Sequence, residues 1–97
     1  MGRDEVLAIL EEHRAEICRR FGVRSLRLFG SVARDEASVG SDIDILVGFS
    51  GSPTFRGYMG LRIFLEDLLG TKVDLITETG LRESVRPHVE KDAIRVA

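Results

Sequence analysis

With 97 residues, of which 43% are hydrophobic and 31% charged, the chain is expected to form one globular domain, residues 1–97, and not a disordered segment. Its net charge of −2 argues against direct binding of nucleic acid, and its single cysteine excludes an intramolecular disulfide. A polar start and the lack of a long apolar run predict a cytoplasmic protein that contacts no membrane.

The first third of the chain predicts a helix followed by a strand. Apolar residues recur at steps of three and four over residues 4–21, which indicates one amphipathic helix that ends at Gly22. Residues 24–29 then alternate as a short strand, with Leu26 and Leu28 on one face. Gly30-Ser31 breaks this strand, and we expect a short helical segment over residues 32–37.

The remainder predicts two further strands and two further helices. Residues 41–49 form the strongest strand, and a helix over residues 54–69 ends at Gly70. A third strand over 72–77 precedes a helix over 81–91, which Pro87 is expected to kink or split, and residues 94–96 add a short edge strand. The order of elements predicts an α/β fold, a small mixed sheet with packed helices.

Three carboxylates lie within the apolar strands. Asp42 and Asp44 are two positions apart, so their side chains share one face of the second strand. Such a pair is costly unless a cation lies between the carboxylates, and oxygen ligands suit Mg²⁺ or Mn²⁺. If the third strand lies beside the second, Asp74 completes a cluster that could hold two cations for a phosphoryl-type displacement.

The Gly30-Ser31 turn is the second candidate feature. It lies where a strand ends and a helical turn begins, and glycine there allows close approach of a phosphate to the backbone. Alone, a Gly-Ser pair is more often a simple turn, and an Asp-x-Asp pair is more often a solvated strand face. Their occurrence together, fifteen positions or fewer apart, favours a site for nucleotides.

These residues spell a known pattern. Gly30-Ser31, Arg34 and Ser41-Asp42-x-Asp44 give GSxxR…SDxD, which resembles the signature of the DNA polymerase β-like nucleotidyltransferase superfamily. The chain is most similar to the minimal nucleotidyltransferases (MNT), small antitoxins paired with HEPN-domain toxins, and the "KVDLIT" strand also fits. Asp35 departs from the pattern, because many relatives carry glycine after the arginine.

The resemblance implies a role for each matching residue. It makes Asp42, Asp44 and Asp74 the catalytic ligands of two Mg²⁺ ions, with Asp74 also helping to deprotonate the attacking hydroxyl. It makes Gly30 and Ser31 the binding site of the ATP triphosphate.

Two further residues of the motif have less definite roles. Arg34 either contacts the nucleotide phosphates or forms an ion pair with Asp35 or Glu36. Ser41, also counted among the nucleotide-binding residues, is expected to support the loop before Asp42 and not to touch the substrate.

The resemblance also implies an activity and a partner. It predicts a nucleotidyltransferase that moves AMP from ATP to a tyrosine hydroxyl of a HEPN toxin ribonuclease in a hetero-oligomer, which neutralises the toxin. An alternative is an antitoxin that acts only by stoichiometric binding. A third possibility, transfer to a small molecule such as an aminoglycoside, is disfavoured because the chain has no room for an acceptor domain.

Overall fold

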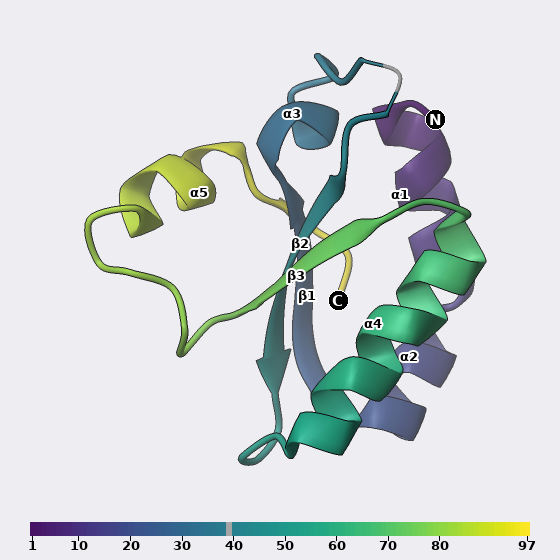
Figure 1. Ribbon diagram of the computed structural model, residues 1–97, viewed down its shortest axis with the longest axis vertical. Helices are drawn as coiled ribbons and strands as arrows, with labels where there is room; N and C mark the ends of the chain where they lie inside the picture. The colour runs from purple at the N-terminus through teal and green to yellow at the C-terminus, as the bar shows by residue number, and fades with distance from the viewer. Residues whose placement is uncertain (39) are drawn as a thin grey trace.

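A four-stranded mixed sheet forms the centre of the computed structural model, which describes residues 1–38 and 40–97 (Figure 1). The strand order is β3-β2-β1-β4, with β1 antiparallel to both β2 and β4, and β2 parallel to β3. The strands are β1 (Val23–Phe29), β2 (Ile43–Phe49), β3 (Val73–Thr77) and β4 (Ile94–Arg95). The predicted α/β fold with a small mixed sheet is therefore confirmed.

The N-terminal segment forms two helices, and the prediction of one continuous helix is wrong. Helices α1 (Arg3–Glu12) and α2 (Arg14–Phe21) are separated at His13. The Ile9 carbonyl accepts hydrogen bonds from the His13 backbone N–H and from its Nδ1, 3.3 and 3.0 Å away, and the regular helical pattern stops there. Gly22 ends α2 in the left-handed conformation, φ 65°, as expected.

Helix α4 (Phe55–Leu69) matches its prediction closely. It begins after Thr54, whose Oγ1 accepts a hydrogen bond of 2.9 Å from the Gly57 N–H, and it ends at Gly70 with φ 68°. It is the longest helix at 15 residues. Within the described residues, no helix is both long enough and apolar enough to span a membrane.

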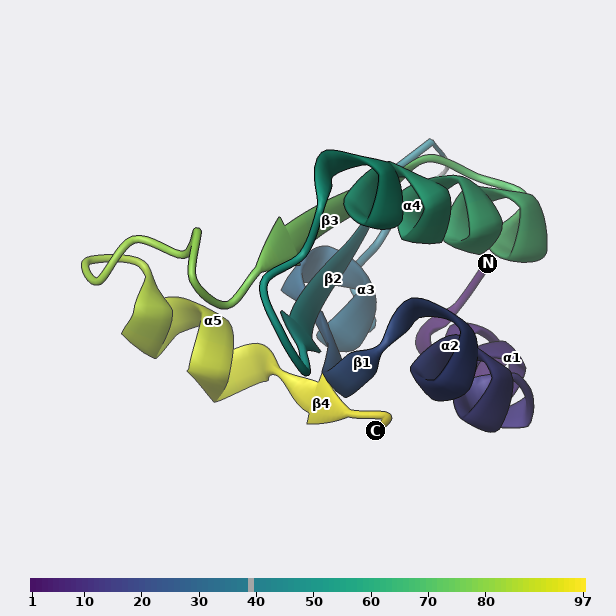
Figure 2. The ribbon, with the colours of Figure 1, turned by 90° about the horizontal axis from the view of Figure 1, so that it is seen from below.

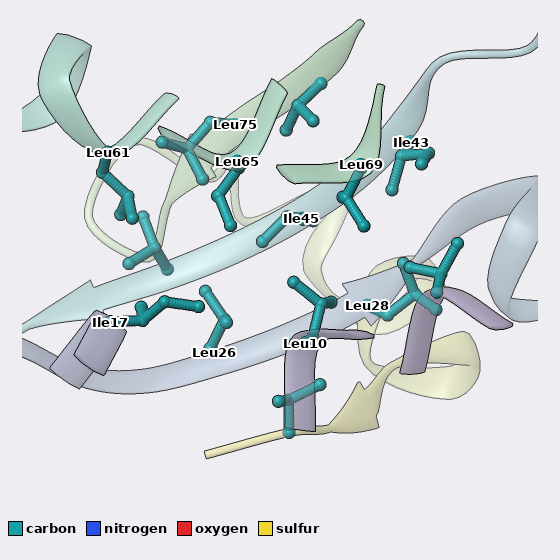
Figure 3. Close-up of a cluster of buried hydrophobic side chains, with 14 of the residues drawn as sticks. Leu10, Ile17, Leu26, Leu28, Ile43, Ile45, Leu61, Leu65, Leu69 and Leu75 are labelled. Carbon is teal, nitrogen blue, oxygen red and sulfur yellow. The ribbon is translucent and has the colours of Figure 1, made fainter. Parts of the chain in front are cut away.

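The main hydrophobic core lies between the sheet and helices α1, α2 and α4. Figure 3 shows leucines and isoleucines from these helices meeting those of β1, β2 and β3. Ile43, Ile45 and Val47 of β2 point into this core, on the strand face opposite to Asp44. On α4 the fully buried positions are Leu61 and Leu65, with Leu69 nearly so.

Side chains of α4 also cover the outer edge of the sheet. The Tyr58 hydroxyl donates a hydrogen bond to the Leu75 carbonyl, and the Glu66 carboxylate accepts one of 3.0 Å from the Val73 N–H. Both partners belong to β3, whose outer edge would otherwise expose unpaired backbone groups. Tyr58 therefore has a structural role at this edge of the sheet.

The opposite face of the sheet carries a smaller apolar cluster and helix α5 (Arg86–Asp92). Figure 2 shows α5 on the other side of the sheet from α4. The predicted helix over 81–91 begins too early, because α5 begins at Arg86. Pro87 lies in its first turn, where proline is tolerated, so the predicted kink or split is also wrong. Phe29, Leu46 and Val89 are the buried members of this second cluster.

Candidate active site

Three carboxylates meet at one end of the α5-covered sheet face. In the parallel pairing of β2 with β3, Asp44 lies opposite Asp74, and across the antiparallel pairing Asp44 lies opposite Phe29 at the end of β1. Asp42 comes two residues before Asp44, just ahead of β2, and is exposed. The structure thus places the second and third strands side by side, the condition under which the sequence predicts an acidic cluster.

The cluster is electrostatically unfavourable without a counter-charge. Burial, the charges of Asp74 and Asp42 and a hydrogen bond to Asp74 together raise the pKa of Asp44 to about 6. The Arg34 guanidinium acts in the opposite direction and is outweighed. A cation bound between these carboxylates would therefore relieve their repulsion at neutral pH.

The donor set suits a hard divalent cation. All three side chains offer only carboxylate oxygens, the ligands of Mg²⁺ or Mn²⁺, and their mutual repulsion would be relieved by such an ion. Among the described residues, however, no three acidic, histidine or cysteine side chains are already arranged around one metal position. The residues fit a metal that takes part of its ligands from elsewhere, and nucleotide phosphates are the natural source.

Gly30 packs directly against the acidic cluster. It begins the short helix α3 (Gly30–Ala33) beside the start of β2, with φ 75° in the region that favours glycine (Figure 1). A Cβ atom on Gly30 would overlap the carboxylate of Asp44. Glycine is therefore required twice here, once by the backbone conformation and once by the close approach of Asp44. This second requirement could not be predicted from the motif.

Arg34 forms ion pairs on both sides. Its Nε lies 3.2 Å from Glu36, one of the two partners expected, and its Nη1 lies 2.8 Å from Asp92 at the end of α5. The contact with Asp92 joins residues 58 positions apart, and no sequence pattern indicated it. Because the charge of Arg34 also lowers the pKa of Asp44, the guanidinium lies within electrostatic reach of the acidic cluster.

The loop between α3 and β2 is held by short local contacts. The Ser41 Oγ accepts a hydrogen bond of 3.1 Å from the Ser38 N–H, which supports the loop before Asp42 as expected of Ser41. The Ser31 carbonyl accepts a bond of 2.8 Å from the Glu36 N–H. Asp35 has φ 60°, in the left-handed region that favours glycine and in which aspartate is among the better tolerated residues. The expected short helical segment is present, but its bounds are wrong, because α3 spans Gly30–Ala33 and not residues 32–37.

The other end of the same sheet face carries a charged network that the sequence did not indicate. Glu78, which follows β3, accepts hydrogen bonds from Arg24, Ser25 and Arg27 of β1 at 3.1, 3.0 and 3.2 Å. Its side chain reaches β1 by crossing β2 at Gly48, where a Cβ would overlap the Glu78 carboxylate. Burial alone would raise the pKa of Glu78, but these hydrogen bonds and the charges of Arg24 and Arg27 lower it.

Comparison with known proteins gives a consistent result. A family model described as the nucleotidyltransferase domain matches residues 10–96. The protein adenylyltransferase MntA of Thermococcus cleftensis is 39% identical over 93 residues, which are 96% of this chain and 94% of that protein.

Solved structures share the fold. One whose name assigns it to the minimal nucleotidyltransferases is 39% identical, with a TM-score of 0.82, over 97% of this chain and 95% of its own. A tri-AMPylated HEPN toxin of Shewanella oneidensis in complex with an MNT antitoxin matches at 19% identity and a TM-score of 0.69, over 94% of this chain and 71% of that one. At that identity the second likeness concerns the fold alone.

The predictions of fold and enzyme class are thereby confirmed, and the acidic end of the sheet is the part of the chain where the family's chemistry is expected. On the match over residues 10–96 and the 39% identity to an archaeal relative, the chain belongs to the nucleotidyltransferase domain family, among its minimal members.

Proposed function

We propose that this chain, acting as a single domain over residues 1–97, transfers AMP from ATP to a tyrosine hydroxyl of a HEPN toxin ribonuclease. The observation that carries the proposal is the gathering of Asp42, Asp44 and Asp74 at one end of the sheet, with the Asp44 carboxylate against Gly30. A protein that only bound its partner would gain nothing from such an unfavourable cluster.

The reaction replaces a phosphoanhydride bond of ATP with a phosphodiester between AMP and the tyrosine. The tyrosine oxygen attacks the α-phosphorus of ATP, the bond from that phosphorus to the bridging oxygen breaks, and pyrophosphate leaves. Little covalent chemistry is required of the protein, which positions the reactants and neutralises charge. Mg²⁺ bound by the three carboxylates would supply that neutralisation.

Each of the predicted site residues then has a defined role. Asp42 and Asp44 would hold the two Mg²⁺ ions, and Asp74 would complete the ligand set and accept the proton of the attacking hydroxyl. The Gly30-Ser31 turn binds the triphosphate, which can approach closely because Gly30 lacks a side chain. Arg34 lies near enough to contribute positive charge to the phosphates once they arrive.

The choice of acceptor rests on the relatives. The 39% identical archaeal relative is named as a protein adenylyltransferase, and the Shewanella oneidensis antitoxin was solved with a HEPN toxin that carries AMP groups. Both names support an acceptor hydroxyl that arrives on a separate protein.

A substoichiometric inactivation assay tests the proposal. A small amount of this chain with Mg-ATP is incubated with an excess of its HEPN partner, and the partner's ribonuclease activity and intact mass are followed. We expect inactivation of the whole excess, persistence after the chain is removed, and a mass increase by whole adenylyl units on a tyrosine.

Matched variants make the assay decisive. The Asp42→Asn/Asp44→Asn variant should lose transfer by a factor of about 10³ or more. The Glu5→Gln/Glu12→Gln variant removes the same two charges from exposed positions on α1 and should transfer normally. Inhibition that follows stoichiometry, needs no ATP and survives the aspartate variant would instead establish the binding-only antitoxin.

A further inference from the structure

Helix α4 has an exposed apolar face. Phe55 is 81% exposed and Ile63 is 53% exposed, and the half-buried Met59 lies between them at one-turn spacing. This face points away from the core, into which the same helix packs Leu61 and Leu65. Contiguous apolar side chains on the surface of a small protein commonly mark an interaction surface.

Two charged residues at the ends of this face have no ion-pair partner among the described residues. Arg56 lies at the start of α4 and Asp67 near its end, and both are exposed. Neither occurs in any salt bridge within the described part of the chain, although Arg62 and Glu66 of the same helix pair at 3.7 Å. Their charges are therefore available to a second molecule.

The spacing along the helix makes the face complementary to itself. Arg56, Gly60, Ile63 and Asp67 follow one another at steps of four, three and four, so they form one stripe. A second α4 laid antiparallel, centred between residues 61 and 62, brings Arg56 opposite Asp67 and Gly60 opposite Ile63. Each contact occurs twice by symmetry. A parallel arrangement would instead oppose like charges.

Gly60 provides the space that this pairing needs. It is partly exposed, and a Cβ there would meet only the Phe21 ring, at 3.6 Å, an ordinary contact distance. The fold therefore places no demand on glycine at this position, whereas a facing Ile63 side chain would use the gap.

We propose that α4 is a homotypic interface, through which a second copy of this chain docks in antiparallel orientation. One pair of helices buries less than the roughly 1,200 Å² of stable complexes, so the dimer should be weak, with a dissociation constant in the micromolar range or above. Helix α5 lies on the other side of the sheet from α4 (Figure 2), and the acidic cluster is on the α5-covered face, so this interface would leave it uncovered.

Sedimentation velocity over a concentration series of the purified chain tests the proposal. We expect the sedimentation coefficient to rise with concentration, and Arg56→Asp or Asp67→Arg to weaken self-association about tenfold or more, because each creates two like-charge contacts. Mixing these two variants should restore dimers, since every facing pair again has opposite charges. Arg19→Asp and Glu12→Arg, equal charge changes at exposed positions on α2 and α1, should leave association unchanged.

Other results would overturn the proposal. A monomer at every concentration up to about 1 mM, or dimers that persist unchanged in Arg56→Asp, would exclude this interface. If the chain is monomeric but Arg56→Asp loses binding to its HEPN partner, the occupant of the face is that partner and not a second copy. The readouts require no nucleotide, so they are independent of the activity proposed above.

Discussion

Asp44, within β2, and Glu78, which follows β3, lie at opposite ends of the same face of the sheet, and each is a partly buried carboxylate. Around Glu78 the fold supplies Arg24, Arg27 and a serine hydroxyl, all within 3.2 Å. Around Asp44 it supplies two more carboxylates, and the pKa of Asp44 rises to about 6 while that of Glu78 falls. The same sheet therefore satisfies one buried charge and leaves the other unsatisfied.

The two ends also use glycine in the same way. Gly48 lets Glu78 cross β2 to reach β1, and Gly30 lets Asp44 lie against the turn that follows β1. Close packing of a carboxylate on backbone is thus common to both ends, and only the charge of the neighbours differs. An end whose charges are balanced contributes to stability, whereas an end with excess negative charge costs stability unless a cation binds there, as the proposed function requires.

The largest effect is expected at Gly30. Gly30→Ala should destabilise the fold by about 2–4 kcal/mol, because the new Cβ would overlap the Asp44 carboxylate and the residue must keep a positive φ. Gly22→Ala is the matched control, since Gly22 has φ 65° but open space around it, and it should cost only about 1 kcal/mol. Urea unfolding at pH 7 measures both; equal losses would show that Asp44 is not in contact with Gly30.

Much of this site could be predicted from the sequence, because the signal is local. Alternation along β2 puts Asp42 and Asp44 on one face, and an acid within the next apolar strand pointed to Asp74. The ends of α2 and α4 could be predicted for the same reason. Gly22 and Gly70 adopt the left-handed conformation that ends a helix, and this preference of glycine is local.

What could not be predicted depends on contacts between distant segments. The Arg34–Asp92 and Arg24–Glu78 pairs join residues more than fifty positions apart, and a single charged residue in a loop or helix carries no sign of its partner. Nothing in the sequence indicated the break at His13, because the spacing of apolar residues continues through it. Helices α1 and α2 together bury the same side chains that one continuous helix would bury. The start of α5 depends on Pro87, whose missing N–H suits a first turn as well as it disrupts a helix interior.

The next effect concerns the balanced end of the face. Glu78→Gln keeps the size of the side chain but removes its charge, so the hydrogen bonds from Arg24 and Arg27 weaken and about 1–2 kcal/mol of stability should be lost at pH 7. Glu90→Gln, an exposed glutamate 3.8 Å from Arg86, should change stability by less than about 0.5 kcal/mol. An equal effect of the two variants in urea unfolding would mean that the network around Glu78 is not stabilising.

The acidic end should respond in the opposite direction. Asp44→Asn removes a carboxylate whose charged form is disfavoured by burial and by Asp74, so stability at pH 7 should rise. A pKa near 6 against an ordinary value near 4 corresponds to about 3 kcal/mol, which solvent screening at this partly exposed group reduces to about 1–2 kcal/mol. A loss of stability in this variant would show that Asp44 is satisfied as a carboxylate.

The pH dependence separates the two ends. Because the folded-state pKa of Asp44 is raised, folded protein binds more protons than unfolded protein between about pH 4 and 6, and its cost to stability appears as the pH rises through that window. The lowered pKa of Glu78 has the reverse consequence: its contribution is present above about pH 4.5 and is lost as the pH falls below it. Urea midpoints measured from pH 3 to 8 should therefore flatten between pH 4 and 6 in Asp44→Asn, and below pH 4.5 in Glu78→Gln. Midpoint curves that stay parallel to the wild type would contradict both assignments.

The smallest effect on stability is expected for the Arg34–Asp92 ion pair, which joins the residue after α3 to the end of α5. The Arg34 side chain is 42% exposed, so Asp92→Asn should lower the urea midpoint less than Glu78→Gln does. Its effect on nucleotide binding should differ in sign from that of Arg34→Gln: removing the arginine removes positive charge beside the acidic cluster, whereas removing Asp92 frees that charge for the phosphates. Calorimetric titration of Mg-ATP should therefore show weaker binding in Arg34→Gln and unchanged or tighter binding in Asp92→Asn. Equal weakening in both variants would mean that Asp92 holds Arg34 in its binding position, and the pair would then belong to the acidic end of the face.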